Sequence, residues 1–254
     1  MNLQTKITGL LTAVFIAVSG AAVSAEAIQT PQTEITFEPR RTADGIDYDV
    51  YINNSNYLST LIFEMNFDKA QSVNMKLTDN ECFDISHSEQ KNPNSLKGYL
   101  GRTGQQTGFS SDDKIKVAEI SVPAPITSTG EVTATVSNAV CTGIYGLESD
   151  AIKGNVTVSD TVRYVIKECS ILSFNKDSIN ILSSKSRNAD VIYASYVGSG
   201  NLINLHKENA DLIQGENTVS ISGIDFDKSE TVSVMVWDSV NSMRPLADKM
   251  TINN

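Results

Sequence analysis

The chain is poor in the residues that most often build metal and catalytic centres. Its 254 residues include only two histidines and three cysteines. His87 and His206 lie in different halves of the sequence, and no Cys-x-x-Cys or Cys/His spacing typical of zinc occurs. We therefore expect no bound metal and no cofactor.

Catalytic motifs are missing as well. There is no Gly-x-Ser-x-Gly motif of a serine hydrolase. Gly198 and Gly200 stand in a strand–turn–strand pattern, whereas a phosphate-binding loop needs a following helix. Asp47 and Asp49 share one strand face, but nothing points to the cleft that paired glycosidase carboxyls require. The sequence predicts a protein that is not an enzyme.

Positive charge is also in short supply. Twenty Lys and Arg residues stand against 30 Asp and Glu residues, which gives a net charge of −10 at pH 7. This acidic excess argues against nucleic acid and anionic membranes as partners. Beyond the N-terminus, no run is long and apolar enough to span a membrane, which takes about 20 residues.

The N-terminal segment has the pattern of a secretory signal peptide. Lys6 precedes the apolar stretch Ile7–Val18, and a run of small residues follows. The stretch is short for a transmembrane anchor, which is the alternative. We expect residues 1–27 to be removed, with cleavage after Ala25 or Ala27. The mature protein is then secreted, and is extracellular or held at the surface of a bacterium.

The three cysteines allow one disulfide in an exported chain. Three pairings are open, and we favour a disulfide between Cys82 and Cys141, because both fall in the same expected domain. The alternative is that these two and Cys169 are all small buried thiols.

Two alternating segments joined by a short linker occupy Lys114–Gly143. Alternation with a period of two residues predicts strands with one buried face. The first segment alternates Ala118, Ile120 and Val122 with Val117, Glu119 and Ser121.

Turn signals recur about every ten residues along the chain, with little helical periodicity. This predicts an all-β protein of two consecutive β-sandwich domains. A turn at Ser159-Asp160-Thr161 separates a terminal strand from a new one, so we place the domains at residues 28–159 and 160–254.

The first domain resembles a cohesin, the dockerin-binding module of cellulosome-type assemblies. Three pieces in cohesin order carry the resemblance: Leu61–Lys69 (LIFEMNFDK), Val117–Val122 (VAEISV) and Val136–Val140 (VSNAV). In the first piece, Lys69 stands where cohesins have proline. The resemblance implies a jelly-roll-type sandwich that binds a dockerin, a small calcium-loaded helical module on another protein. The partner would carry the calcium, because this chain has no Asp-x-Asp-x-Asp-Gly loop of its own.

In cohesins one flat sheet face makes the dockerin contact. The resemblance places this face on the outward positions of two strands. Ile62 and Val117 would be apolar on a solvent face, which suits a partner surface. The predicted partner-binding residues are Thr60, Ile62, Glu64, Val117, Glu119 and Ser121.

The alternative function is carbohydrate binding or surface adhesion. A face with several coplanar aromatic rings would favour polysaccharide as the partner. The sequence has no cluster of Trp or Tyr, which favours a protein partner, in a system for polysaccharide degradation.

The second domain resembles a C-terminal β-sandwich module of clostridial and ruminococcal secreted proteins. From this we expect an Ig/fibronectin-like sandwich. Trp237 could stack on a sugar ring, but its strand pattern favours a core or interdomain position. The residues that carry the resemblance are Val191–Tyr196, Gly200–Leu202, Gly215–Val219, Val234–Ser239 and Met243–Leu246.

Overall fold

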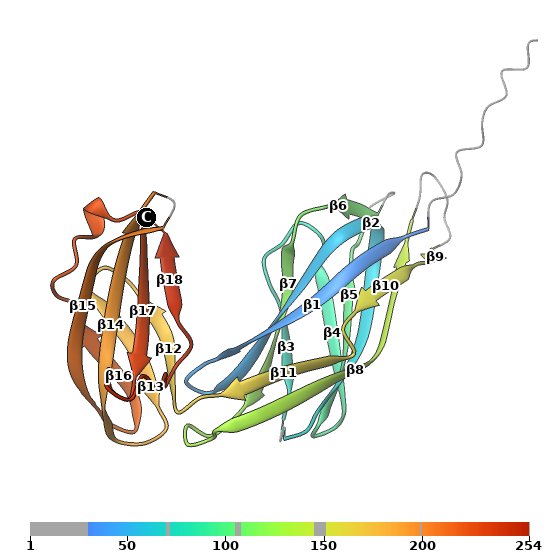
Figure 1. The fold of residues 1–254 in the computed structure, drawn as a ribbon. Coiled ribbons are helices and arrows are strands. Elements are labelled where there is room, and N and C mark those ends of the chain that lie inside the picture. The colour runs from blue at the N-terminus through green and yellow to red at the C-terminus, as the bar shows by residue number, and fades with distance from the viewer. Residues whose placement is uncertain (1–29, 70–71, 105–107, 145–150, 199, 254) are drawn as a thin grey trace, which may run out of the picture.

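The computed structural model describes residues 30–69, 72–104, 108–144, 151–198 and 200–253. Within them it contains eighteen β-strands and one short 3₁₀ helix, η1 (Phe226–Lys228) (Figure 1). The all-β prediction is confirmed. The strands form two sandwiches with separate hydrophobic cores. The expected signal peptide, residues 1–27, lies outside the described residues.

The first sandwich contains β1 to β11. Its strands are β1 (Gln32–Arg41), β2 (Gly45–Phe67), β3 (Asn74–Leu77), β4 (Ile85–Asn92), β5 (Ser95–Gly101), β6 (Phe109–Ser111), β7 (Ile115–Pro123), β8 (Gly130–Gly143), β9 (Ile152–Lys153), β10 (Asn155–Val158) and β11 (Thr161–Ile166).

One long strand, β2, belongs to both sheets of this sandwich. Its first half pairs with β1 and β7 in sheet A, where β10 and β3 are the outer strands. Its second half pairs with β5 and β8 in sheet B, and β4 and β11 lie outside these two. The polar residues Asn53–Asn56 lie in the middle of this strand. The chain continues as strand through this segment and changes sheet there.

Alternating residues of β2 build the centre of the first core. Leu61, Phe63 and Met65 are fully buried, and the Phe63 ring meets Phe37 of the other sheet edge-on, with ring centroids 5.5 Å apart. Full burial of one such side chain contributes about 1.5–3 kcal/mol to stability. Because these residues point inward, Thr60, Ile62 and Glu64 must point outward.

The second sandwich packs a three-stranded sheet against a four-stranded one. Sheet C has the order β12-β13-β16, and sheet D has the order β15-β14-β17-β18. The Ig/fibronectin-like class of this domain stays a prediction. Its strands are β12 (Cys169–Phe174), β13 (Ser178–Ser183), β14 (Arg187–Val197), β15 (Asn201–Leu212), β16 (Gly215–Ser220), β17 (Thr231–Trp237) and β18 (Met250–Asn253).

The change from one sandwich to the other falls later than the sequence predicted. Strand β11 pairs with β8 along its whole length, and its last residue, Ile166, is buried in the first core. Cys169 already belongs to the second core. The boundary therefore lies at Lys167 and Glu168 and not at residues 159 and 160. The turn before β11 is a turn within the first domain.

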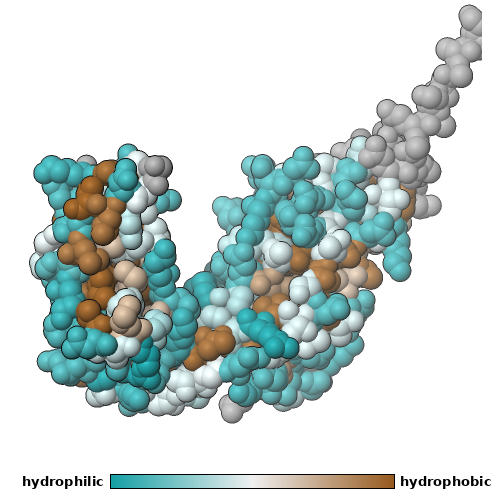
Figure 2. All heavy atoms as spheres, in the orientation of Figure 1, coloured by the Kyte–Doolittle hydropathy of each residue, from teal (hydrophilic) through white to brown (hydrophobic). Residues whose placement is uncertain are grey.

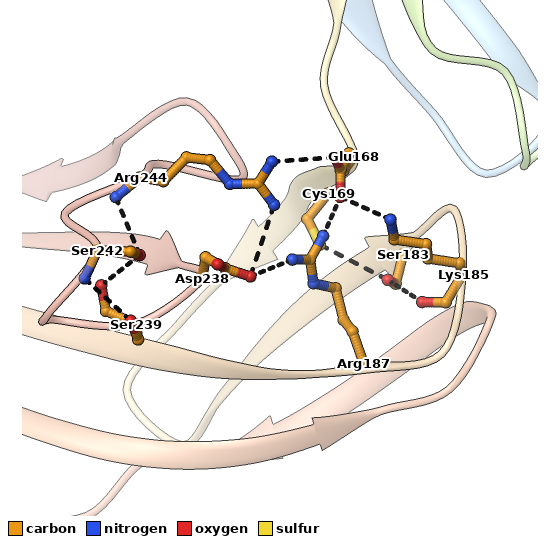
Figure 3. Close-up of polar contacts among 9 residues, drawn as sticks. All are labelled: Glu168, Cys169, Ser183, Lys185, Arg187, Asp238, Ser239, Ser242 and Arg244. Carbon is orange, nitrogen blue, oxygen red and sulfur yellow. Dashed lines mark hydrogen bonds and ion pairs between the residues drawn. The ribbon is translucent and has the colours of Figure 1, made fainter.

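An ion-pair network attaches this short linker to the second sandwich (Figure 3). Glu168 pairs with the buried Arg187, with Lys185 at 3.3 Å and with Arg244 at 3.4 Å. Asp238 joins both arginines, and its Oδ1 lies 3.5 Å from Arg244 Nη2. Burial alone would raise the pKa of Glu168, but the contacts with Arg187 and Lys185 outweigh it and lower this pKa.

The predicted disulfide is wrong, because Cys82, Cys141 and Cys169 are all free and buried. Each thiol has its own surroundings. The Cys141 thiol donates to the Asn155 carbonyl at 3.5 Å, and Cys169 lies 3.6 Å from the Ser183 hydroxyl. Burial raises the pKa of Cys82 to about 12 and that of Cys141 to about 11.

Among the described residues, no helix is long and apolar enough to cross a membrane. No group of three or more His, Cys, Asp or Glu side chains in the described part of the chain could hold a metal ion.

Candidate functional site

The outer side of sheet B, formed by β4, β5, β2 and β8, is called the sheet B face below. Thr60, Ile62 and Glu64 all lie on it, at the outward positions that the alternation of their strand predicted, and the structure leaves them half-buried. Their role as partner-binding residues stays a prediction. The neighbouring strands add residues in register with them, so the face consists of rows that run across the strands.

The central row of the sheet B face is apolar and aromatic. Ile62 stands between Tyr99 of β5 and Val140 of β8. His87 of the edge strand β4 stands opposite Tyr99, with ring centroids 5.7 Å apart and the rings tilted by 38°. The His87 side chain is 69% exposed. This row offers apolar contact across four strands.

The next row is charged. Glu64 stands opposite Lys97, and Lys97 stands opposite Glu89. Glu64 Oε1 lies 3.4 Å from Lys91 Nζ and 3.7 Å from Lys97 Nζ. The Tyr99 hydroxyl donates to Glu89 at 3.3 Å, which connects this row to the apolar one. These contacts fix the directions of the charged groups.

The third row, on the opposite side of the apolar row from the charged row, combines hydroxyls with an exposed aliphatic side chain. The Thr60 and Thr142 hydroxyls are 2.6 Å apart. Ile85 of β4 is 53% exposed and lies over Gly101, where an added Cβ would come within 3.0 Å of the isoleucine. Glycine at this position therefore makes room for Ile85.

Sequence reasoning did not identify several residues of the sheet B face. Ile85, His87, Tyr99 and Val140 all belong to it. The alternation in Leu96–Leu100 is the signal that could have placed Tyr99 outward. The pairing partners of β2 were not available from the sequence.

Val117 does not belong to this face, and its prediction as a partner-binding residue is wrong. It is fully buried in the first core. A bulge in the pairing of β7 with β2 explains this, because Val50 pairs with Ala118 while Tyr51 pairs with Lys116. Val117 is the extra residue, and the alternation of β7 is interrupted there.

Glu119 and Ser121 do point outward, but from sheet A on the opposite side of the sandwich. Glu119 pairs with Arg40 at 2.6 Å and with Lys116 at 3.1 Å. The Ser121 hydroxyl donates to Asp47 at 2.8 Å. The structure therefore does not bring these two residues together with Thr60, Ile62 and Glu64.

The outward charged residues of sheet A form one ion-pair network, called the sheet A network, which contains Arg40, Lys116, Glu119 and the two aspartates noted in the sequence, Asp47 and Asp49. Asp47 lies 2.9 Å from Arg40, and Asp49 lies 2.7 Å from Lys116. Burial alone would raise the pKa of Glu119, but hydrogen bonds and charge from Lys116 and Arg40 lower it. Three carboxylates and two cations thus largely neutralise one another on this face.

Trp237 lies on the outer side of sheet D in the second sandwich. Val232, Val234 and Val236 fill the inward positions of its strand, and Trp237 is half-buried opposite Asp190. Tyr196 pairs with Thr231 at the far end of the same strand pair, so the two rings do not form one platform. Figure 2 shows a band of apolar side chains on this visible face, and Leu202 and Leu205 are among the exposed apolar residues there.

About half of the chain is similar to solved cohesin modules. One is the seventh ScaB type I cohesin from Pseudobacteroides cellulosolvens, with 10% identity, a TM-score of 0.40, and coverage of 53% of this chain and 92% of that chain. Another is a non-cellulosomal cohesin from the archaeon Archaeoglobus fulgidus, with 14% identity, a TM-score of 0.35, and coverage of 53% and 91%.

A third is the sixth cohesin of scaffoldin B from Acetivibrio cellulolyticus, in complex with a mutant Cel5 dockerin. It has 12% identity and a TM-score of 0.33, and the match covers 52% of this chain and 100% of that chain. No protein-family model matches the chain, and no curated protein matches it.

Proposed function

We propose that this chain is a secreted, non-catalytic binding protein whose sheet B face docks a dockerin-bearing exported protein. The system it serves degrades extracellular polysaccharide. The observation that carries the proposal is the register of β4, β5, β2 and β8, which aligns His87, Tyr99, Ile62 and Val140 in one apolar row. The resemblance of Leu61–Lys69 to the cohesin strand gives this row its expected partner.

The composition of the face supports a protein partner over a sugar. A sugar-binding platform needs several coplanar aromatic rings. Tyr99 and His87 are tilted relative to each other by 38°, and aliphatic side chains make up the rest of the row. An apolar centre with a polar and charged surround is the usual anatomy of a protein interface.

The charged row beside the apolar one supports an oriented contact. Glu64 and Glu89 alternate with Lys91 and Lys97 along the same side of the row. Complementary charges on a partner helix would set its direction across the strands. Ile62 at the centre would supply apolar contact, and the rim would supply specificity.

The test is binding of the mature chain to dockerins from its own proteome, measured by isothermal titration beside a panel of polysaccharides. We expect Ile62→Asp to abolish dockerin binding, because a carboxylate would be buried in the centre of the contact. The matched control is Leu205→Asp, which places the same change at an exposed aliphatic residue of the second sandwich.

The control variant should bind like the unmodified protein, and both variants should keep the thermal midpoint within a few degrees. Binding to a glycan without binding to any dockerin would overturn the proposal. Unchanged dockerin affinity in Ile62→Asp would show that another face makes the contact.

A further inference from the structure

A cleft of about 540 Å³ opens at one end of the first sandwich, between sheets A and B. Tyr48 and Phe67 form its floor, and both belong to the buried core. Their rings meet edge-on with centroids 5.4 Å apart. Protein interiors hold few voids larger than a water molecule, whereas ligand pockets measure about 300–1,000 Å³. The cleft has the volume of a ligand site.

A buried arginine holds one wall of the cleft in place. The Arg41 guanidinium donates to the carbonyls of Gly45 at 2.9 Å, Pro125 at 2.8 Å and Ala124 at 3.4 Å. Arg41 is only 6% exposed, and burial lowers its pKa. It ties the turn between β1 and β2 to the loop between β7 and β8, which lines the cleft. The wall is therefore formed before any ligand arrives, which favours affinity.

The polar groups at the cleft favour a cation. Asp44 and Asp68 line it with carboxylates. Among the described lining residues Lys69 contributes an ammonium, which donates to the Glu131 carbonyl at 3.1 Å and keeps its charge, so the lining carries two negative charges against one positive. Asp68 also accepts a hydrogen bond from the Thr133 backbone N–H at 3.1 Å. Arg41 stands behind the wall and directs its guanidinium at the backbone carbonyls. A cation in the cleft would meet two carboxylates and the aromatic rings of the floor, and both attract positive charge.

We propose that this cleft binds a small cation with an apolar body, of the arylalkylammonium class. The apolar body packs against Tyr48, Phe67 and Val132, and the ammonium points to Asp68 and Asp44 at the rim. The site is separate from the sheet B face, because its lining comes from the ends of both sheets and the loops that join them. The inference is independent of dockerin binding.

The test uses 2-phenylethylammonium with the chain lacking residues 1–27. Methyl NMR follows Ile46, Ile126 and Ile166, which line the cleft, and Ile179 of the second core serves as the reference. The neutral 2-phenylethanol and the anionic 3-phenylpropanoate are titrated in parallel. We expect the three lining methyls to shift while Ile179 stays unchanged. The ammonium should bind tightest and the carboxylate weakest.

Variants separate the cleft from nonspecific binding. Val132→Phe should fill the cleft and reduce ammonium affinity at least tenfold, whereas Thr127→Phe, at an exposed residue of the neighbouring loop outside the lining, should change nothing. Asp68→Asn should lower ammonium affinity about two- to fivefold and leave the alcohol unaffected. If Val132→Phe does not fold, Ile126→Ser at the exposed rim takes its place, with a smaller loss of affinity expected.

No shift with any probe would overturn the proposal. So would equal binding of all three probes, or binding that neither Val132→Phe nor Ile126→Ser reduces.

Discussion

Asp47 and Ile62 both point outward from β2, yet they lie on opposite faces of the first sandwich. Asp47 pairs with Ser121 in sheet A, and Ile62 pairs with Tyr99 in sheet B. The strand crosses from one sheet to the other between them. Asn54 and Tyr57, at the crossing, have φ angles of 47° and 50°, in the left-handed region that non-glycine residues rarely adopt.

Close backbone contacts surround this crossing. A Cβ added to Gly143 of β8 would lie 1.8 Å from the Tyr57 carbonyl oxygen, and one added to Gly108 would lie 2.0 Å from it. Glycine is therefore required on both sides of Tyr57. The crossing divides the outward residues of β2 between the charged network of sheet A and the proposed docking face of sheet B.

The crossing gives a first prediction about stability. Asn54→Val should lower the free energy of unfolding by about 1–2 kcal/mol, because a β-branched side chain is strained at a positive φ angle. Asn54→Gly should change the free energy of unfolding by less than about 0.5 kcal/mol, because two effects oppose each other. Glycine adopts the positive φ angle without strain, which is stabilising, but the hydrogen bond from Asn54 to Glu34 is lost, which is destabilising. Urea unfolding measures both. Equal stability of the two variants would show that the left-handed backbone is not maintained in solution.

The alternation in Leu61–Phe67 was enough to predict the directions of Thr60, Ile62 and Glu64. The same reasoning failed for Val117, because the bulge opposite Val50 and Tyr51 places two consecutive residues in the core. A bulge depends on how two strands pair, and a single strand's sequence does not record it. The sequence also does not show to which sheet each strand belongs. Local alternation is sufficient to predict the all-β class, but the residues that share one sheet face can be predicted only when the strand pairing is known.

The second prediction tests the position of Val117. Val117→Asp should lower the free energy of unfolding by about 3 kcal/mol or more, because an unpaired carboxylate would be buried in the core. The control, Val165→Asp, changes a residue of β11 that is 52% exposed and should cost less than about 1 kcal/mol. Thermal unfolding followed by circular dichroism compares the two. If the Val117→Asp variant were as stable as the unmodified protein, Val117 would have to lie at the surface.

A third prediction concerns the cysteines. Burial raises the pKa of all three thiols, to about 12 for Cys82 and about 11 for Cys141, so the reactive thiolate is scarce at pH 8. We expect slow reaction with a thiol reagent such as Ellman's reagent in the native protein. In guanidinium chloride all three cysteines should react at once. A count of one thiol in the unfolded, unreduced protein would show that a disulfide forms.

The last prediction follows the ion pairs of the linker. The pKa of Glu168 is lowered in the folded state, so its contribution to stability is present above its unfolded pKa, near 4.5. The contribution is lost as the pH falls through the lower, folded pKa. Glu168→Gln should therefore reduce stability at pH 7 by about 1.5–3 kcal/mol, the usual loss for a hydrogen bond to a charged group. It should also flatten the fall in stability between pH 5 and pH 3.

Lys185→Gln is the matched control for this network. The Lys185 side chain is 62% exposed, and its removal should cost less than about 1 kcal/mol. The two losses should differ because Arg187 is buried, with a side chain only 9% exposed, and depends on Glu168 and Asp238 for its charge partners. Urea unfolding at several pH values measures these effects. If Glu168→Gln kept the full acid sensitivity of the unmodified protein, the pH dependence would have to come from other carboxylates, such as Glu119 of the sheet A network.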